Sequence, residues 1–261
     1  METMNRAFQF GQPEVATAYY SYSAGLLSEI SGILGKEEEK THYLELSEKV
    51  KEAYRHLFVK DGHISSKRQC EFVRPLAFGL LEENDAKRAA ADLNVLVIEN
   101  GYHLNTGFLS TPYLCEVLAE YGYIETAYRL LLQKTYPGWL YPVEKGATTI
   151  WETWDGIRED GTVHDSLNHY SYGAVSGWLL SGVCGIQYTK DSLKLSPVVH
   201  PLLKYAKGSF DSPRGRIVSE WSYEEETETF AYHFEIPQGV QAVISLQDGR
   251  CETVDGGVYD F

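Results

Sequence analysis

The sequence has no excess of basic residues. Among its 261 residues, 23 Lys and Arg stand against 37 Asp and Glu, which gives a formal net charge of −14. Nucleic acids and anionic membrane surfaces are bound through basic patches, so this balance argues against both as partners. The charge fits a soluble enzyme that acts on an uncharged substrate.

Paired cysteines and long apolar runs are also absent. Cys70, Cys115, Cys184 and Cys251 are widely separated and form no Cys-x-x-Cys pair, so neither a metal site nor a disulfide framework is indicated. Cys115 and Cys184 are expected to pack in the core as free thiols. Four glycines and two serines interrupt the most apolar run, 172–188, which indicates a helix inside a domain rather than a membrane span. No secretory signal opens the chain, which favours a cytoplasmic location.

The spacing of apolar residues is helical up to about residue 186. Helices are expected over residues 13–35, 37–58, 68–81, 84–100, 111–122, 124–134 and 170–185. A turn is expected at residues 60–63, which read Lys-Asp-Gly-His. The first helix is expected to bury one apolar stripe, made of Val15, Ala18, Tyr19, Tyr22, Leu26, Ile30 and Ile33.

After residue 186 the apolar spacing becomes two, which is typical of strands. Apolar residues alternate with others over 217–223, 230–236 and 240–246, and residues 255–259 are expected to form the last strand. These strands predict a small antiparallel β-sandwich. The chain is therefore mainly α with a β tail.

Residues 146–156 are the most informative segment and read Gly-Ala-Thr-Thr-Ile-Trp-Glu-Thr-Trp-Asp-Gly. Glu152 lies between Trp151 and Trp154, and apolar indole walls disfavour the charged form of a nearby carboxylate, as a general acid or base requires. Flat indole faces also suit the C–H face of a sugar ring. The alternative is a short aromatic helix in which Glu152 is solvated or paired with Lys145 or Arg158.

Five ordered motifs give the chain a family resemblance. Residues 17–20 read Thr-Ala-Tyr-Tyr, 107–114 Gly-Phe-Leu-Ser-Thr-Pro-Tyr-Leu, and 136–142 Tyr-Pro-Gly-Trp-Leu-Tyr-Pro. The Trp-rich segment follows, and then residues 168–175, Asn-His-Tyr-Ser-Tyr-Gly-Ala-Val. Together with the β-rich tail, these motifs resemble the α-L-rhamnosidases of glycoside hydrolase family 78 over nearly the whole chain.

The resemblance implies an (α/α)6 catalytic barrel followed by a C-terminal β-domain. Residues 1–187 would form a partial barrel, and residues 188–261 a small antiparallel β-sandwich. The spacing indicates about seven helices, where the complete barrel of that family has twelve.

The resemblance also implies an inverting hydrolysis of terminal rhamnose from glycosides, with no metal and no organic cofactor. Glu152 matches the family's general base, and His169 matches the histidine that reaches the bound sugar. A neutral imidazole can both donate to and accept from sugar hydroxyls. Asn168 is a weaker binding candidate that could simply cap a helix. Candidates for the sugar platform are Trp139, Trp151 and Trp154, each of which could instead belong to the core.

The sequence departs from the family at the general acid. That residue belongs to an Asp-Glu-Arg segment followed by Gly-Trp, and no Asp-Glu-Arg segment occurs here. The expectation is therefore a truncated rhamnosidase without its acid. One alternative is a non-catalytic remnant that folds and at most binds sugar. Another is an unrelated (α/α)6 phosphorylase or lyase, which would need more basic residues near Glu152 than Lys145 and Arg158.

Overall fold

The computed structural model describes residues 12–261, which divide into two compact units. The first unit runs to Asn100 and includes Asn105–Tyr113, and the second comprises Gly101–Leu104 and Leu114–Phe261. Residues 1–11, which the predicted first domain includes, lie outside the described part. The domain boundary expected between residues 187 and 188 stays a prediction.

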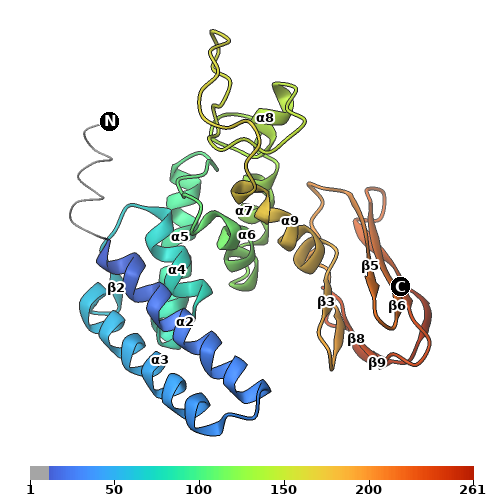
Figure 1. Ribbon diagram of the computed structural model, residues 1–261. Coiled ribbons are helices and arrows are strands. Elements are labelled where there is room, and N and C mark those ends of the chain that lie inside the picture. Colours follow the sequence, from blue (N-terminus) through green and yellow to red (C-terminus); the bar gives the residue numbers. More distant parts are fainter. Residues whose placement is uncertain (1–11) are drawn as a thin grey trace. The chain divides into compact units, whose positions relative to one another are not determined.

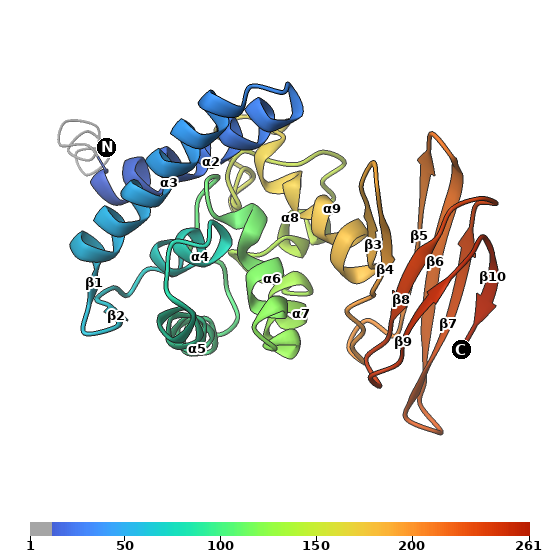
Figure 2. The same ribbon diagram turned by 90° about the horizontal axis from the view of Figure 1, so that it is seen from below.

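The first unit is built from helical hairpins. Helices α2 (Pro13–Ile33) and α3 (Glu37–Phe58) run side by side in opposite directions, as Figures 1 and 2 show. The expected bounds of both helices are confirmed to within two residues. The hairpin formed by β1 (Val59–Lys60) and β2 (His63–Ile64) then leads to α4 (Gln69–Ala77) and α5 (Glu83–Glu99).

The predicted turn after α3 is also confirmed. Asp61 and Gly62 connect β1 to β2 with φ angles of 51° and 78°. Positive φ at both central residues matches the right-handed twist of a two-residue hairpin, which is why an Asp-Gly pair is suited to this position.

The apolar stripe predicted for α2 is wrong in its C-terminal half. Leu26, Ile30 and Ile33 are exposed, and Ile33 keeps 85% of its surface. The face that is buried carries the small residues Ser21, Ala24, Ser28 and Ser31.

Hydrogen bonds explain why small residues occupy the interface between α2 and α3. Ser21 and Ser47 exchange hydrogen bonds between the two helices, and the Ser28 hydroxyl donates to the Lys40 carbonyl at 2.8 Å. Short side chains let the two backbones approach closely enough for these bonds. The large apolar side chains are therefore displaced to the neighbouring face.

At the N-terminal half of α2, Tyr19 and Tyr22 pack against Phe78 at the end of α4. The rings of Tyr22 and Phe78 are nearly parallel, with their centroids 4.4 Å apart. The ring centroids of Tyr19 and Phe78 are 5.1 Å apart. Both tyrosines are partly buried and pack against a core cluster that contains Ala18, Tyr54 and Phe78.

A buried ion pair connects α2 to α4. The Arg74 guanidinium donates to both carboxylate oxygens of Glu14 and, 2.9 Å away, to the hydroxyl of Ser110. The Tyr54 hydroxyl donates to the same carboxylate at 2.8 Å. The exposed fraction of the two charged side chains is only 6% for Arg74 and 16% for Glu14. Each charge therefore depends on the other for solvation.

Glu14→Gln is expected to lower the free energy of unfolding by about 3–5 kcal/mol, because it leaves the Arg74 charge buried without its partner. Urea unfolding of the purified chain measures the change. Glu83→Gln is the matched control, since it breaks the exposed Glu83–Lys87 pair of α5, and exposed pairs contribute little. Equal stability of the two variants would contradict the prediction.

The second unit contains α6 (Thr111–Glu120), whose first residues belong to the first unit, and then α7 (Ile124–Leu131) and α8 (Leu140–Glu144). One continuous helical stretch follows, in which η1 (Ser171–Ala174) is 3-10, α9 (Val175–Trp178) is α and η2 (Leu179–Val183) is π.

The helix predicted over 170–185 is therefore present but irregular. A Cβ on Gly182 would lie 2.3 Å from the indole nitrogen of Trp178. Because Gly182 has no side chain, the Trp178 indole can pack against the next helical turn, where the hydrogen-bond pattern changes from α to π.

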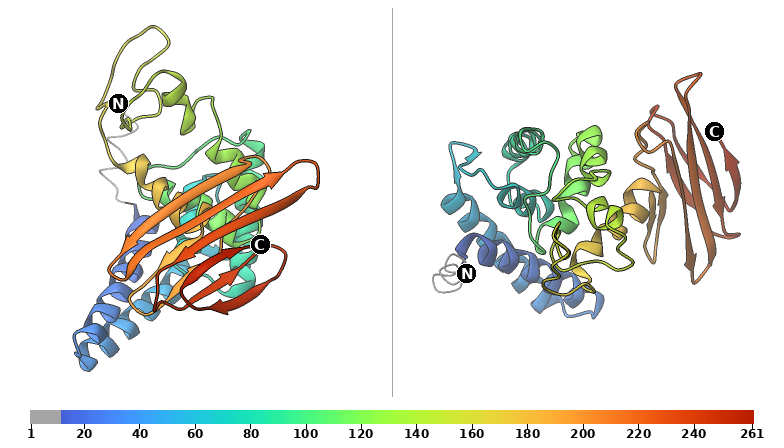
Figure 3. Two further views of the ribbon diagram at one scale, coloured as in Figure 1. Left: turned by 90° about the vertical axis from the view of Figure 1, so that its right-hand side faces the viewer. Right: turned by 90° about the horizontal axis from the view of Figure 1, so that it is seen from above.

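The remaining strands form two sheets in separate layers, as Figures 2 and 3 show. One sheet has the order β10-β7-β6-β5 and the other β3-β4-β8-β9. The strands are β3 (Ile186–Tyr188), β4 (Leu193–Leu195), β5 (Tyr205–Ser212), β6 (Gly215–Glu224), β7 (Thr229–Ile236), β8 (Ala242–Ser245), β9 (Cys251–Val254) and β10 (Gly257–Asp260).

The predicted sandwich is confirmed with one departure, because β4 and β8 pair in parallel. All other strand pairs in the described residues are antiparallel. The three strands predicted from alternation correspond to β6, β7 and β8.

The sandwich is joined to the preceding helix by buried polar bonds. The Trp221 indole donates to the Val183 carbonyl at 2.8 Å, and the Ser219 hydroxyl donates to the Cys184 carbonyl. Cys115 and Cys184 are buried free thiols, as predicted. Within residues 12–261, no helix combines the length and the apolar character needed to cross a membrane.

Candidate functional site

The Trp-rich segment lies in a loop whose two arms run antiparallel between α8 and η1. The His169 amide donates to the Ile150 carbonyl and the Glu152 amide to the Ser166 carbonyl, both at 2.8 Å. Nearer the tip, the Arg158 amide donates to the Thr162 carbonyl at 3.0 Å. Figure 1 shows this loop extending away from α7 and α9 of the same unit.

Gly156 allows the arms to close. A Cβ at this position would lie 2.9 Å from Leu167 and 3.3 Å from the Trp151 ring. Since any larger residue would push the arms apart, the Asp-Gly end of the motif shapes the loop that carries Glu152.

Glu152 is half-buried, and its carboxylate accepts a hydrogen bond from the Ser166 amide at 3.0 Å. One backbone–backbone bond and one backbone–side-chain bond with Ser166 therefore fix both the chain and the carboxylate. The segment is not a helix, and no ion pair of Glu152 with Lys145 or Arg158 occurs among the described residues. The short helix and the ion pairs of the alternative are therefore wrong, whereas its partly solvated Glu152 is not contradicted.

His169 and Asn168 lie on the opposite arm. The His169 ring is half-buried, stacks on Tyr170 with centroids 5.3 Å apart, and accepts the Ser171 amide at Nδ1. Asn168 is exposed, and its backbone forms a turn with the Ser166 hydroxyl. The pairing of the arms thus places His169 opposite Ile150, two positions before Glu152 in the sequence.

The three candidate tryptophans converge. Trp154 stacks on Tyr172 with centroids 3.8 Å apart, and Trp139 meets Trp154 edge to face at 5.8 Å. The Trp139 indole donates to the Tyr172 carbonyl at 3.0 Å. Trp151 is 3% exposed, whereas Trp154 is half-buried. Trp151 therefore contributes mainly to the core, and Trp154 offers the most accessible indole.

These rings surround a cavity of about 270 Å³, the aromatic pocket. Its lining consists of Trp139, Pro142, Val143, Ala147, Thr148, Thr149, Ile150, Trp151, Trp154 and Tyr172. A small apolar cavity with a few polar groups is typical of a ligand site. The structure brings the three tryptophans together here, but neither Glu152 nor His169 belongs to the lining.

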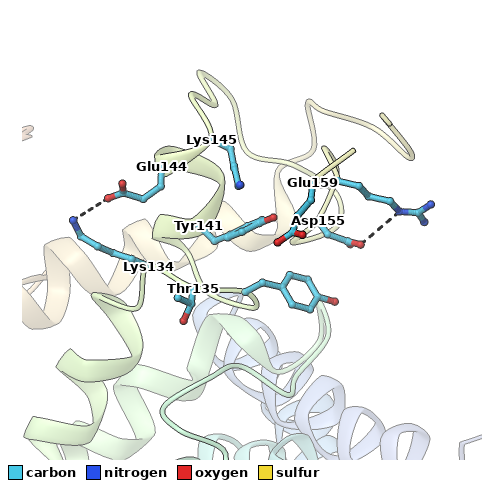
Figure 4. A pocket seen from close by; sticks show the side chains of 9 residues that line it. Lys134, Thr135, Tyr141, Glu144, Lys145, Asp155 and Glu159 are labelled. Carbon is cyan, nitrogen blue, oxygen red and sulfur yellow. Dashed lines mark ion pairs between the residues drawn. The ribbon is translucent and has the colours of Figure 1, made fainter. Parts of the chain in front are cut away.

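A second cavity of about 640 Å³, the polar pocket, lies on the other side of α8. It is lined by Lys134, Thr135, Tyr136, Tyr141, Glu144, Lys145, Asp155, Arg158 and Glu159 (Figure 4). Helix α8 gives Tyr141 to this pocket and Pro142 to the aromatic pocket. Trp154 and Asp155 likewise face different pockets, so the two cavities share their walls.

Sequence reasoning missed Tyr172 and His164. Tyr172 is far from the tryptophans in the sequence, so no spacing rule connects them. His164 lies within a loop rich in Asp and Gly, and its neighbour Asp165 is the signal that could have drawn attention to it.

His164 links the two arms near the tip of the loop. Its Nδ1 lies 2.9 Å from an Asp165 carboxylate oxygen, and its Nε2 lies 2.8 Å from the Asp155 carbonyl. Both neighbours are acceptors, and a neutral imidazole has one N–H, so only the protonated ring satisfies both. The hydrogen bond to Asp165 raises the pKa of His164, while burial and Arg158 oppose the shift.

The loop is expected to loosen as the pH rises. Because the folded-state pKa of His164 is raised, its contribution to stability is complete below the ordinary value of about 6.5 and is lost above it, as the pH passes the folded-state value. Amide exchange in residues 156–165, corrected for its intrinsic pH dependence, should therefore accelerate with pH. His164→Gln should remove this dependence, and His56→Gln on α3 should retain it. A dependence that survives in His164→Gln would assign it to another group.

Comparison with known proteins gives consistent matches. The model of the bacterial alpha-L-rhamnosidase 6 hairpin glycosidase domain matches residues 3–183, and that of the bacterial alpha-L-rhamnosidase C-terminal domain matches residues 192–258. An alpha-L-rhamnosidase of Formosa agariphila is 33% identical over 249 residues, which cover 92% of this chain and 27% of that protein. One of Streptomyces avermitilis is 35% identical over 216 residues, which cover 79% and 21%.

Solved structures give the same result. The α-L-rhamnosidase of Aspergillus terreus superimposes with a TM-score of 0.87 at 29% identity, covering 94% of this chain and 29% of that one. The Streptomyces avermitilis α-L-rhamnosidase complexed with L-rhamnose gives 0.86 at 30% identity, covering 94% and 26%. The chain spans about a quarter of the length of the curated relatives that it matches.

Proposed function

This chain belongs to the bacterial α-L-rhamnosidase family, and from that membership we propose that it carries the general base and part of the sugar site of an inverting α-L-rhamnosidase. The proposed substrate is a glycoside with a terminal α-L-rhamnosyl group. The match of the six-hairpin glycosidase domain over residues 3–183 is the observation that carries this proposal. A cytoplasmic location stays a prediction.

In this proposal Glu152 is the general base. Inversion needs one carboxyl group that protonates the leaving oxygen and a second that activates water on the opposite ring face, with the two about 6.5–9.5 Å apart. The amide of Ser166 holds the Glu152 carboxylate at 3.0 Å, which supports this role because a base must be oriented toward its water.

The aromatic pocket is proposed to hold the rhamnosyl ring. Rhamnose carries a methyl group at C5 and has C–H faces, both of which suit apolar walls. Trp154 would supply the accessible indole face, since Tyr172 already covers its other face. His169 would hydrogen-bond a sugar hydroxyl with its imidazole ring, which can both donate and accept.

A non-catalytic sugar-binding function is the second candidate. The observation that favours it is that neither Glu152 nor His169 lines the aromatic pocket. Under this alternative the chain would bind rhamnose, and replacement of Glu152 would have no effect on any reaction.

Titration with L-rhamnose, observed through the tryptophan indole N–H signals, tests the proposed site. L-Rhamnose should shift the signals of Trp139 and Trp154, and D-glucose, which has a hydroxymethyl in place of the methyl, should not. Trp154→Ala should weaken binding at least about tenfold, as for the loss of one aromatic stacking partner. Unchanged indole signals at saturating rhamnose would contradict the proposal.

A further inference from the structure

One arm of the loop that carries the Trp-rich segment contains a bulge. The Glu152 amide pairs with the Ser166 carbonyl at 2.8 Å. Nearer the tip, the His164 amide donates to the Gly156 carbonyl at 3.0 Å. Between these two pairs, one arm has three residues, 153–155, and the other arm has only one. As in a β-bulge, the extra residues lie outside the regular pairing, so their position depends on other contacts.

The bulge contains Trp154, which offers the most accessible indole of the aromatic pocket. The hydroxyl oxygen of its neighbour Thr153 is buried and has no hydrogen-bond partner among the described residues. On the other side of Trp154, the Asp155 carbonyl oxygen lies 2.8 Å from His164 Nε2, and an Asp155 carboxylate oxygen lies 3.3 Å from the same nitrogen. The His164 imidazole therefore bonds the bulge to the opposite arm.

The same ring is also bonded on its own arm. His164 Nδ1 lies 2.9 Å from an Asp165 carboxylate oxygen. Asp165 has a φ of 56°, in the left-handed region that is costly for a residue other than glycine, so a bond to its side chain helps to hold it there. The next residue is Ser166, whose amide donates to the Glu152 carboxylate at 3.0 Å. One ring thus contacts a neighbour of each proposed functional group.

We propose that His164 is a positioning residue of the rhamnose site, whose imidazolium holds the arms so that Trp154 faces the sugar and the Glu152 carboxylate keeps its orientation. It acts through Asp155 and Asp165 rather than by touching the sugar. The inference rests on the proposed function, since that function assigns the sugar to this loop. Rhamnose affinity should therefore depend on the protonation of this one ring.

The charges around His164 determine the direction of the effect. Both ring nitrogens face acceptors, so only the protonated ring, with two N–H groups, bonds both arms. Asp165 and Asp155 favour the imidazolium, and Arg158 opposes it. Tyr136, before α8, faces Asp155, but burial raises the pKa of its phenol, which stays neutral while histidine titrates. Loss of the ring proton with rising pH should therefore weaken rhamnose binding.

NMR of the 261-residue chain without ligand measures the positioning directly. The Ser166 amide and the Trp154 indole N–H signals should shift with pH, with the same midpoint as the ring protons of His164. In His164→Gln both signals should stay constant over that range, because a glutamine side chain does not titrate.

Calorimetric titration with L-rhamnose measures the consequence for the site. The affinity should fall about tenfold between about pH 5.5 and about pH 8.5, on the two sides of the histidine range, which is an ordinary coupling between two sites. Linkage is reciprocal, so saturating rhamnose should raise the pKa of His164, which a role in stability alone would not do. His164→Gln should bind at both pH values with the affinity of the original chain at the higher pH.

His233→Gln is the matched control. His233 also lies between two carboxylates, those of Asp260 at 2.7 Å and Glu235 at 3.4 Å, but on strand β7 of the sandwich. This variant should keep the pH dependence of rhamnose affinity and of both NMR signals.

The outcomes separate this inference from the proposed function. A pH dependence of affinity that remains in His164→Gln would overturn the inference and assign the titration to another group, such as His169. Signals of Ser166 and Trp154 that do not follow the His164 midpoint would also overturn it. Failure of rhamnose to bind at either pH would overturn the proposed function, and the NMR titration without ligand would still decide whether His164 positions these groups.

Discussion

Glu152→Gln is expected to lower rhamnoside turnover by about 10²–10⁴-fold, the usual contribution of a general base. The amide keeps the shape of the side chain and can still accept the Ser166 hydrogen bond, but it cannot take a proton from water. The measurement needs a protein with both carboxyl groups, made by joining these residues to the acid-bearing part of a relative.

The control for this experiment is Glu226→Gln, which changes an exposed carboxylate between β6 and β7 and should leave turnover unchanged. His169→Ala in the same protein should raise KM for the rhamnoside more than it alters the pH profile. Near-normal turnover of Glu152→Gln would show that another residue is the base.

The 261 residues expressed alone are expected to show no measurable hydrolysis of a chromogenic rhamnoside. Inversion requires two carboxyl groups across one bond, and the resemblance implies that the acid belongs to an Asp-Glu-Arg segment that this sequence does not contain. The exposed side chains of Leu26, Ile30 and Ile33 on α2 should also promote association, visible by size-exclusion chromatography.

A monodisperse monomer that turns over about once per second or faster, within the range of ordinary enzymes, would contradict this expectation. It would mean that Glu144 or Asp155 acts as the acid. Both are poorly placed for that role, since Glu144 pairs with Lys134 and Asp155 lies 3.3 Å from the His164 ring.

Much of the fold could be predicted because its local signals agree with its tertiary contacts. Pro13 and Gly35 bracket α2, and α3 has the predicted bounds, since both are long helices with clear ends. Strand β7 alternates between more and less buried residues along its length, as a two-residue period requires.

Other features depend on contacts that no local rule contains. Side-chain size, rather than hydrophobicity, decides which face of α2 meets α3, because the hydroxyls of Ser21 and Ser28 donate hydrogen bonds to backbone carbonyls of α3. The short α8 and the parallel pairing of β4 with β8 are likewise set by distant residues.

The candidate site was predictable in part. The sequence motif directs attention to the three tryptophans, and the structure gathers them around the aromatic pocket. Tyr172 also lines that pocket. It lies 33 positions after Trp139 in the sequence, so neither a helical nor a strand period relates the two residues. The roles of Glu152, His169 and Asn168 stay predictions, because they depend on a bound sugar.

The parallel pairing of β4 with β8 has a consequence for the order of folding. In the register, Lys194 lies opposite Val243, and the chain between them forms β5, β6 and β7. Hairpins β3–β4, β5–β6 and β8–β9 close over short loops, whereas β4 and β8 must meet across a long one, which costs more entropy and slows the search. We therefore expect the second sheet to be completed only after the intervening strands have brought its two halves together.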